Sequence, residues 1–229
     1  PYAALFRSEG AIAAHRFCLG ARPGEIDRAS GNPKSWLMAQ IAGPAPQPHP
    51  LAGEPFANAG KLAAEEDEYK VQKFMNKGNK KKGEKRDPSV PKMGDGNVRK
   101  RTYVEEMSAR FALGFTTDRP FAERLVRFWS NHFTISASRK KVLLFAGDFE
   151  REAIRPHITG TFEDMLFAVV MHPAMQIDLD NWHAIGPNSP SGQKRSKGLN
   201  EKLGRERREL DTLGVDAGLA QAGVIATCR

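Results

Sequence analysis

The chain contains little cysteine, with only Cys18 and Cys228 among its 229 residues. Two cysteines near opposite ends form no disulfide framework, and no Cys-x-x-Cys pair is present to hold zinc. Cys18 stands among apolar residues in a helical context, so we expect it to be a small core residue. The composition therefore excludes disulfide-rich and zinc-stabilised small domains.

Long apolar runs are also lacking. No stretch reaches the roughly 18 apolar residues that a membrane-spanning helix needs, and no secretory leader is visible after Pro1. We therefore expect no membrane span and a soluble protein, either cytoplasmic or exported. Strand patterns are scarce too, since the strongest candidate is Lys141–Phe145 (KVLLF), which fits a helix equally well.

The chain has enough apolar residues for a packed core and an excess of positive charge. Hydrophobic residues make up 40% and charged residues 27% of the chain, and the formal net charge is +8. Much of the excess lies in two runs, Lys77–Arg86 and Lys194–Arg208. Neither run contains the interleaved aromatic residues typical of single-strand binding. We therefore do not expect a nucleic-acid partner, and we interpret both runs as solvated loops and helix faces.

The clearest helical pattern runs from Thr117 to Ile135 and predicts the central helix of the fold. Its large side chains recur at steps of three and four, which places them on one face; they are Phe121, Leu125, Phe128, Trp129, His132 and Phe133. We expect this face to be buried, with His132 as a hydrogen-bonded core histidine. The outward face is predicted to hold Glu123, Arg124 and Arg127.

Similar patterns predict a mainly α fold, an irregular multi-helix bundle with long loops and little or no β-structure. The further helices are expected over Ala11–Leu19, Pro33–Ile41, Arg101 to Gly114, Asp148–Arg155, Thr161–Met171 and Asn200–Gly214, with a charged helix over Glu65–Phe74. Composition divides the chain into N-terminal helices (residues 1–43), a variable Pro- and Lys-rich linker (44–100) and a helical core (101–229). We expect the linker to be mobile, above all over Asn76–Gly96, because it has few apolar residues to bury.

The polar stretch over residues 175–200 (MQIDLDNWHAIGPNSPSGQKRSKGLN) is the segment that most resembles a site. Long polar connections between helices are often functional. Carboxylate and imidazole groups at Asp178, Asp180 and His183 could ligate a divalent metal, together with the amide of Asn181 and with His172 upstream. The alternative is structural, because Asp and Asn often bond their own backbone in turns.

The same stretch offers groups that could act as the general acid and base of an enzyme. The candidate catalytic residues are Asp180, Asn181 and His183, together with His132 from the central helix. Groups that could bind or brace the site are Asn188, Ser189, Asn200, Glu201, Arg205, Glu206 and Glu209. The alternative is a non-catalytic binding or scaffold module, in which these groups only lock loop to helix. That alternative predicts that backbone groups satisfy these polar side chains and that no open pocket adjoins them.

Several motifs, in order, resemble the DUF1800 family. They are AAHRFCLGARPGEI (13–26), FWSNHFTIS (128–136), EREAIRPHITGTFEDML (150–166), LDNWHAIGPNS (179–189) and GLNEKLGRERRELDTLGVDAG (198–218). The resemblance implies a mainly α-helical bacterial protein of uncharacterised function. Family members are usually longer, so we expect this chain to be an N-terminal portion, truncated at its C-terminus, on which a C-terminal half packs.

The family pattern carries over to polar and aromatic positions along the core. These positions are Trp129, Asn131, His132, Arg155, Pro156, Asp180, Asn181, Gly186, Asn188, Ser189, Asn200, Glu201, Arg205, Glu206, Glu209, Leu213 and Gly214. The resemblance assigns no catalytic role to any of them. The chain departs from the family at Asp211, where a histidine is usual.

Overall fold

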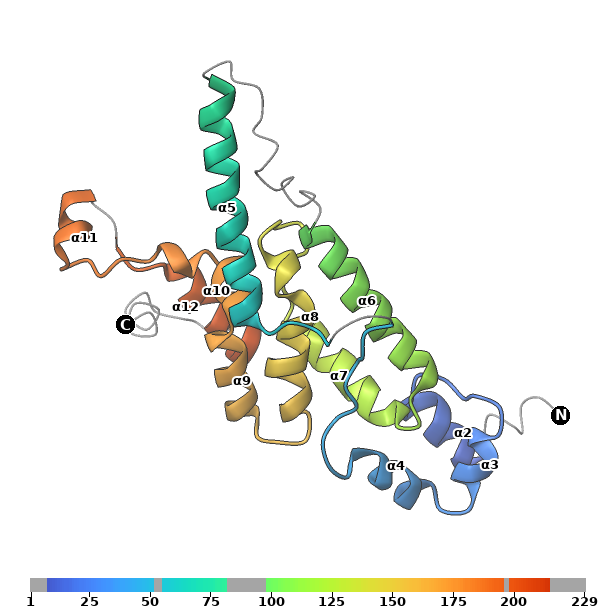
Figure 1. Cartoon of the computed structure of the whole chain (residues 1–229). Helices are drawn as coiled ribbons and strands as arrows, with labels where there is room; N and C mark the ends of the chain where they lie inside the picture. Colours follow the sequence, from blue (N-terminus) through green and yellow to red (C-terminus); the bar gives the residue numbers. More distant parts are fainter. Residues whose placement is uncertain (1–7, 52–54, 82–97, 196–197, 215–229) are drawn as a thin grey trace.

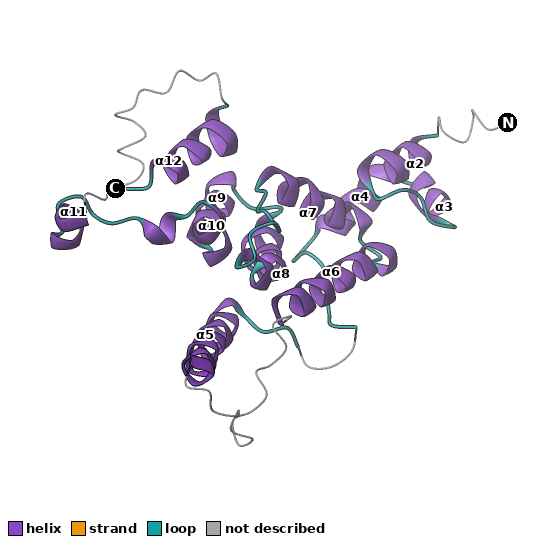
Figure 2. Cartoon of the chain, turned by 90° about the horizontal axis from the view of Figure 1, so that it is seen from above, coloured by secondary structure: helices purple, strands orange, loops and turns teal. Residues whose placement is uncertain are grey.

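The computed structural model describes residues 8–51, 55–81, 98–195 and 198–214 (Figure 1). Within these ranges all regular structure is helical, and no strand occurs (Figure 2). The elements are α2 (Glu9–Ile12), η1 (Ala13–Phe17), α3 (Glu25–Ser30), α4 (Pro33–Ile41), α5 (Ala59–Lys81), α6 (Val98–Thr116), α7 (Pro120–His132), η2 (Val142–Leu144), α8 (Ala146–Phe149), η3 (Glu150–Ile154), η4 (Arg155–His157), α9 (Phe162–Met171), α10 (Pro173–Asp178), η5 (Asn181–His183), α11 (Pro190–Arg195), α12 (Glu201–Arg208) and η6 (Glu209–Leu213). The predicted mainly α class is confirmed.

The N-terminal helices are joined to the core at the start of α7. The side-chain Oε1 of Gln40, which is buried at the end of α4, accepts a hydrogen bond from Phe121 N at 2.8 Å. The guanidinium of Arg119 donates to the backbone oxygens of Gln40 and Pro44, at 2.6 Å each. The bond to Gln40 O satisfies a carbonyl that the end of α4 leaves without a partner, and the bond from Phe121 N satisfies a free N–H in the first turn of α7. Cys18 is fully buried, as predicted.

The buried face of α7 differs from the predicted one. Glu123 was expected to point outward, yet it is fully buried, whereas Phe128 is 59% exposed. His132 is also exposed rather than a core residue, and its Nε2 lies 3.2 Å from Asp211 O. Apolar periodicity misplaces this face because Glu123 enters the core paired with a buried arginine.

The main core is formed by α7 and the helices that follow it. Its buried members include Val126 of α7, Leu144 of η2, Phe149 of α8, Ile154 of η3 and Val169 of α9. The strand considered for Lys141–Phe145 is wrong, because Val142–Leu144 forms a 3₁₀-helix. Short apolar runs do not distinguish a strand from a buried helical turn.

The expected 175–200 loop contains three short helical pieces. It contains the end of α10, all of η5 and all of α11. Asp180 stands between α10 and η5 with a φ of 58°. This is the left-handed region, which Asp tolerates better than most residues and which turns the chain between the two helices.

Helix α5 is longer than the predicted Glu65–Phe74. It runs to Lys81 and so occupies part of the segment that was expected to be mobile; the remainder of that segment lies outside the described residues. Leu62 is buried in the core near its start, and the rest of α5 extends away from the other helices (Figures 1 and 2). None of the described helices has both the length and the apolar run that a bilayer crossing requires.

Candidate functional site

The segment formed by α8, η3 and η4 carries two groups of charged residues. The first group, which we call the ionic network, is centred on Arg155, whose side chain is fully buried. Its Nη1 and Nη2 donate to the two carboxylate oxygens of Glu123, at 2.7 and 3.0 Å. Its Nη2 and Nε donate to Glu150 Oε1, at 2.6 and 3.1 Å.

The remaining polar atoms of the ionic network are also paired. Glu150 Oε2 accepts from Arg110 Nε and from Ser130 Oγ. Arg155 Nη1 also donates to Pro46 O at 2.6 Å, which ties the segment after α4 to the core. Burial alone would lower the pKa of Arg155, but the carboxylates of Glu123 and Glu150 raise it. Arg155 therefore stays charged, with a complete set of partners.

The second group, which we call the orphan cluster, consists of Asp148, Arg151, Glu152 and His172. Asp148 is 2% exposed; its Oδ1 accepts from Arg151 Nη2 at 3.2 Å, and its Oδ2 has no hydrogen-bond partner. His172 is also buried, and its Nε2 has no hydrogen-bond partner either. One carboxylate oxygen each from Asp148 and Glu152 and one ring nitrogen of His172 all lie within 4.8 Å of one another.

Hydrogen bonding defines the tautomer of His172. Its Nδ1 accepts from Ala174 N at 3.1 Å and caps α10. Burial, with a smaller effect of Arg151, lowers the pKa of His172 to about 4, so the ring is neutral near neutral pH. A neutral ring that accepts at Nδ1 carries its proton on Nε2. The ring therefore presents an N–H donor to Glu152 Oε2, which lies 3.7 Å away.

The environment of Asp148 raises the pKa of its carboxyl group. Burial raises its pKa to about 7, and the negative charges of Glu152 and Glu106 add to this effect, while Arg151 opposes it. Both forms of the carboxyl are therefore populated near neutral pH.

A divalent cation fits these side chains poorly. Asp148, Glu152 and His172 offer three ligand atoms close enough for one ion. A metal-bound imidazole, however, needs a lone pair on the ligating nitrogen. In this arrangement the lone pair is on Nδ1, which caps α10, and Nε2 carries the proton. The orphan cluster is therefore better suited to exchanging protons.

Arg151 connects the orphan cluster to Glu106 of α6. Arg151 Nη2 donates to Glu106 Oε1 at 2.8 Å, and its guanidinium lies 4.6 Å from the ring centre of Phe56. Arg151 Nη1 is buried without a partner. Glu106 Oε2 accepts from Gly147 N, and a side chain at position 147 would collide with that carboxylate. The side chain of Glu152, 47% exposed, connects the cluster to solvent.

The structure brings two predicted metal ligands together at an arginine. Arg139 Nη1 donates to Asp180 Oδ1 at 2.8 Å, and its Nε lies 3.7 Å from Asp178 Oδ1. Asp178 Oδ1 also accepts from Ser136 N. His183 is exposed beside Trp182, and it does not join the two aspartates in any group of potential ligand atoms within 4.8 Å among the described residues.

Asn181, predicted as catalytic, and several predicted binding residues make contacts within their own segment. Asn181 Nδ2 donates to Gln176, Ser189 Oγ donates to Gly186 O, and Asn200 Nδ2 donates to Leu179 O. Asn188 and Glu201 are exposed, Glu206 is half-buried, and Arg205 lies 3.7 Å from Glu209 on the next turn. His132 packs among Trp129, Phe133 and Phe162, in contact with η6.

Sequence analysis did not identify the orphan cluster as a site. Asp148 and Glu152 are four residues apart, so they share a helix face. His172 directly precedes a proline at the start of a helix, a position typical of caps. These patterns were present in the sequence, but nothing in it shows that His172 meets the α8–η3 segment.

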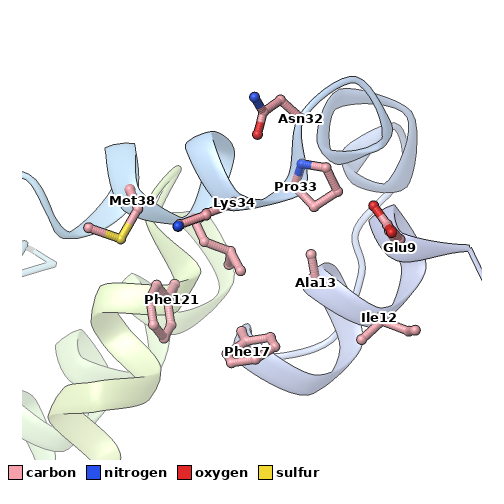
Figure 3. A pocket seen from close by; sticks show the side chains of 10 residues that line it. Glu9, Ile12, Ala13, Phe17, Asn32, Pro33, Lys34, Met38 and Phe121 are labelled. Carbon is pink, nitrogen blue, oxygen red and sulfur yellow. The ribbon is translucent and has the colours of Figure 1, made fainter.

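A hollow lies at the N-terminal end of the fold (Figure 3). It has a volume of about 530 Å³ and is lined mainly by apolar side chains of α2, η1, α4 and the start of α7. Phe17 and Phe121 meet edge to face beneath it, while Glu9 and Lys34 lie at its rim.

Comparison with known proteins gives one match. Searches of curated proteins and of solved structures found no similar protein. A family model described as a protein of unknown function (DUF1800) matches residues 12–229. The match covers the helices from η1 onward, including the ionic network and the orphan cluster. The chain therefore belongs to the DUF1800 family.

Proposed function

We propose that the orphan cluster is the acid–base centre of an enzyme. The single observation that carries this proposal is the pair of buried atoms, Asp148 Oδ2 and His172 Nε2, that have no hydrogen-bond partner. Buried polar groups in folded proteins are nearly always paired, because an unpaired group costs about 1–3 kcal/mol. Two such atoms within one cluster of side chains fit a place where a substrate or water completes the bonding.

Each residue of the cluster has a distinct part in the proposed proton transfer. Asp148 gives or takes the proton, because its pKa of about 7 allows both forms near neutral pH. His172 stays neutral and donates from Nε2 to a developing negative charge. Glu152, exposed to solvent, returns the proton, and Arg151 holds Asp148 in place through Oδ1. Proton transfer to and from an organic substrate is the reaction class that this set supports.

The proposal is tested by titrating the side-chain carboxyl carbons of the ¹³C-labelled full chain by NMR. We expect Asp148 to titrate near pH 7 and its signal to be lost in Asp148→Asn. In parallel, the chain is assayed on nitrophenyl esters, phosphates and glycosides. Any turnover should be lost in Asp148→Asn and kept in Asp180→Asn, a matched change at the predicted polar segment. Titration of Asp148 near pH 4, or turnover that needs Asp180 instead, would contradict the proposal.

A structural role is the second proposal, for residues 175–200. It is supported by the partners of Asp178, Asp180, Asn181, Ser189 and Asn200, which are an arginine, a neighbouring amide or backbone groups. In this role the segment locks α10 to α12, through the bond from Asn200 to Leu179 O. Asn200→Ala should then lower stability without changing any turnover.

A further inference from the structure

The outer half of helix α5 carries an apolar face that no other described element covers. Val71, Phe74 and Met75 are 58%, 81% and 65% exposed. Their spacing of three and four residues places them on one side of the helix. Phe74 lies about 18 Å along the helix axis from Leu62, the residue that anchors α5 in the core. The exposed face is therefore held well away from the body of the protein (Figure 1).

Charge is segregated along the same helix. The inner half carries the acidic run Glu65, Glu66, Asp67 and Glu68. From Tyr69 to Lys81 there is no acidic residue, and the lysines of this outer half are Lys70, Lys73, Lys77, Lys80 and Lys81. Lys70 bridges back to Asp67 at 2.5 Å, and the other four lysines follow Lys70 in the sequence.

We infer that the outer half of α5, residues 69–81, docks on the surface of an anionic lipid bilayer. A helix with lysines on its polar side and Phe, Val and Met on the other lies in the interface plane, with the apolar side in the headgroup region. Basic residues beside that face gain from the negative potential of anionic lipids. The acidic inner half would be repelled by the same surface, so contact is confined to the outer half.

Nucleic acid and acidic proteins are weaker candidates for this surface. Single-strand binding uses several aromatic stacking platforms, whereas this half-helix has Tyr69 and Phe74 on different sides. An acidic protein would satisfy the lysines but would need its own apolar groove for three neighbouring apolar side chains. An anionic bilayer supplies both the negative charge for the lysines and an apolar environment for the three side chains, and it needs no preformed groove.

The test is co-sedimentation of the full chain with lipid vesicles. We expect binding to vesicles of phosphatidylcholine mixed with phosphatidylglycerol, and little binding to phosphatidylcholine alone or in high salt. Phe74→Ser and the double change Lys73→Glu with Lys77→Glu should each weaken binding by about tenfold. Phe167→Ser is the matched control, because Phe167 of α9 is 66% exposed on the body of the protein, and it should leave binding unchanged.

Three results would overturn the inference. They are no binding of the unaltered chain to anionic vesicles, equal binding to neutral ones, and binding that Phe74→Ser leaves intact. Binding to single-stranded DNA or to an acidic polypeptide in place of vesicles, lost with the lysine changes alone, would assign the surface to that partner. Circular dichroism of each variant checks that α5 remains helical.

Discussion

The ionic network and the orphan cluster are two buried charged groups on one helical segment. They share η3, since Glu150 belongs to the first and Arg151 and Glu152 to the second. In the ionic network every guanidinium nitrogen of Arg155 and every carboxylate oxygen of Glu123 and Glu150 has a partner. In the orphan cluster Asp148 Oδ2, Arg151 Nη1 and His172 Nε2 have none.

The difference separates a structural use of buried charge from a functional one. A buried ion pair with complete bonding holds helices in one arrangement, although it adds little net stability. An unpaired buried group only costs stability unless a ligand completes it. Equal burial therefore does not imply an equal role, and the count of satisfied atoms distinguishes the two groups.

Breaking the ionic network should have the largest effect. Glu123→Ala leaves the Arg155 charge buried with Glu150 as its remaining acidic partner, which costs about 3–5 kcal/mol of unfolding free energy. Urea denaturation measures this loss. Glu105→Ala, a change at an exposed glutamate of α6, is the control and should stay within about 0.5 kcal/mol. Equal losses for the two variants would show that the network is not structural.

The orphan cluster should make the free energy of unfolding depend on pH. The folded pKa of Asp148, about 7, is above its ordinary value of 3.8, so the folded state binds the extra proton. The stabilising contribution of Asp148 to the free energy of unfolding is present below pH 4 and is lost as pH rises to about 7. In the unaltered chain, His172 has the opposite pH dependence and offsets this loss. His172→Gln removes the offset. The free energy of unfolding of the variant should therefore fall relative to that of the unaltered chain as pH rises from 4 to 6.5, by on the order of 1–3 kcal/mol.

Asp148→Asn should give the opposite slope. The folded pKa of His172, about 4, is below its ordinary 6.5, so its contribution is present above pH 6.5 and is lost as pH falls toward 4. Without Asp148, the variant should gain stability relative to the unaltered chain as pH rises through this window. Urea denaturation at a series of pH values measures both slopes. Parallel curves for the two variants would contradict the assigned pKa shifts.

Local patterns in the sequence predicted much of the fold. The bounds Pro33–Ile41 of α4 match the prediction, and α9 begins where Thr161 caps it by accepting from Asp164 N. These features depend on neighbours in sequence, such as a proline at a first turn or a cap three residues away. The 3.6-residue period likewise gave the existence of α7, though not its buried face.

The candidate site could not be predicted in the same way. Glu123 and Arg155 are 32 residues apart, and Asp148 and His172 are 24 apart. A buried charge pair reverses the usual rule that charged residues face water, and only the tertiary fold shows the pairing. The polar segment around Asp180 drew attention because its groups are close in sequence, yet closeness there produced turns and caps.

The smallest expected effect on stability comes from an ion pair at the surface, which serves as a comparison for the two buried groups. Arg139→Ala removes the partner of Asp180 and of Asp178, but Arg139 and Asp180 are 36% and 45% exposed. Exposed pairs contribute about 0–1 kcal/mol because water screens them, and Asp178 keeps its bond from Ser136 N. Urea denaturation should therefore show a loss below about 1 kcal/mol, with no change in its pH slope. A loss as large as that of Glu123→Ala would mean that the 175–200 segment holds the helices together, as the ionic network does. The distinction between structural and functional charged groups would then depend only on the unpaired atoms of the orphan cluster.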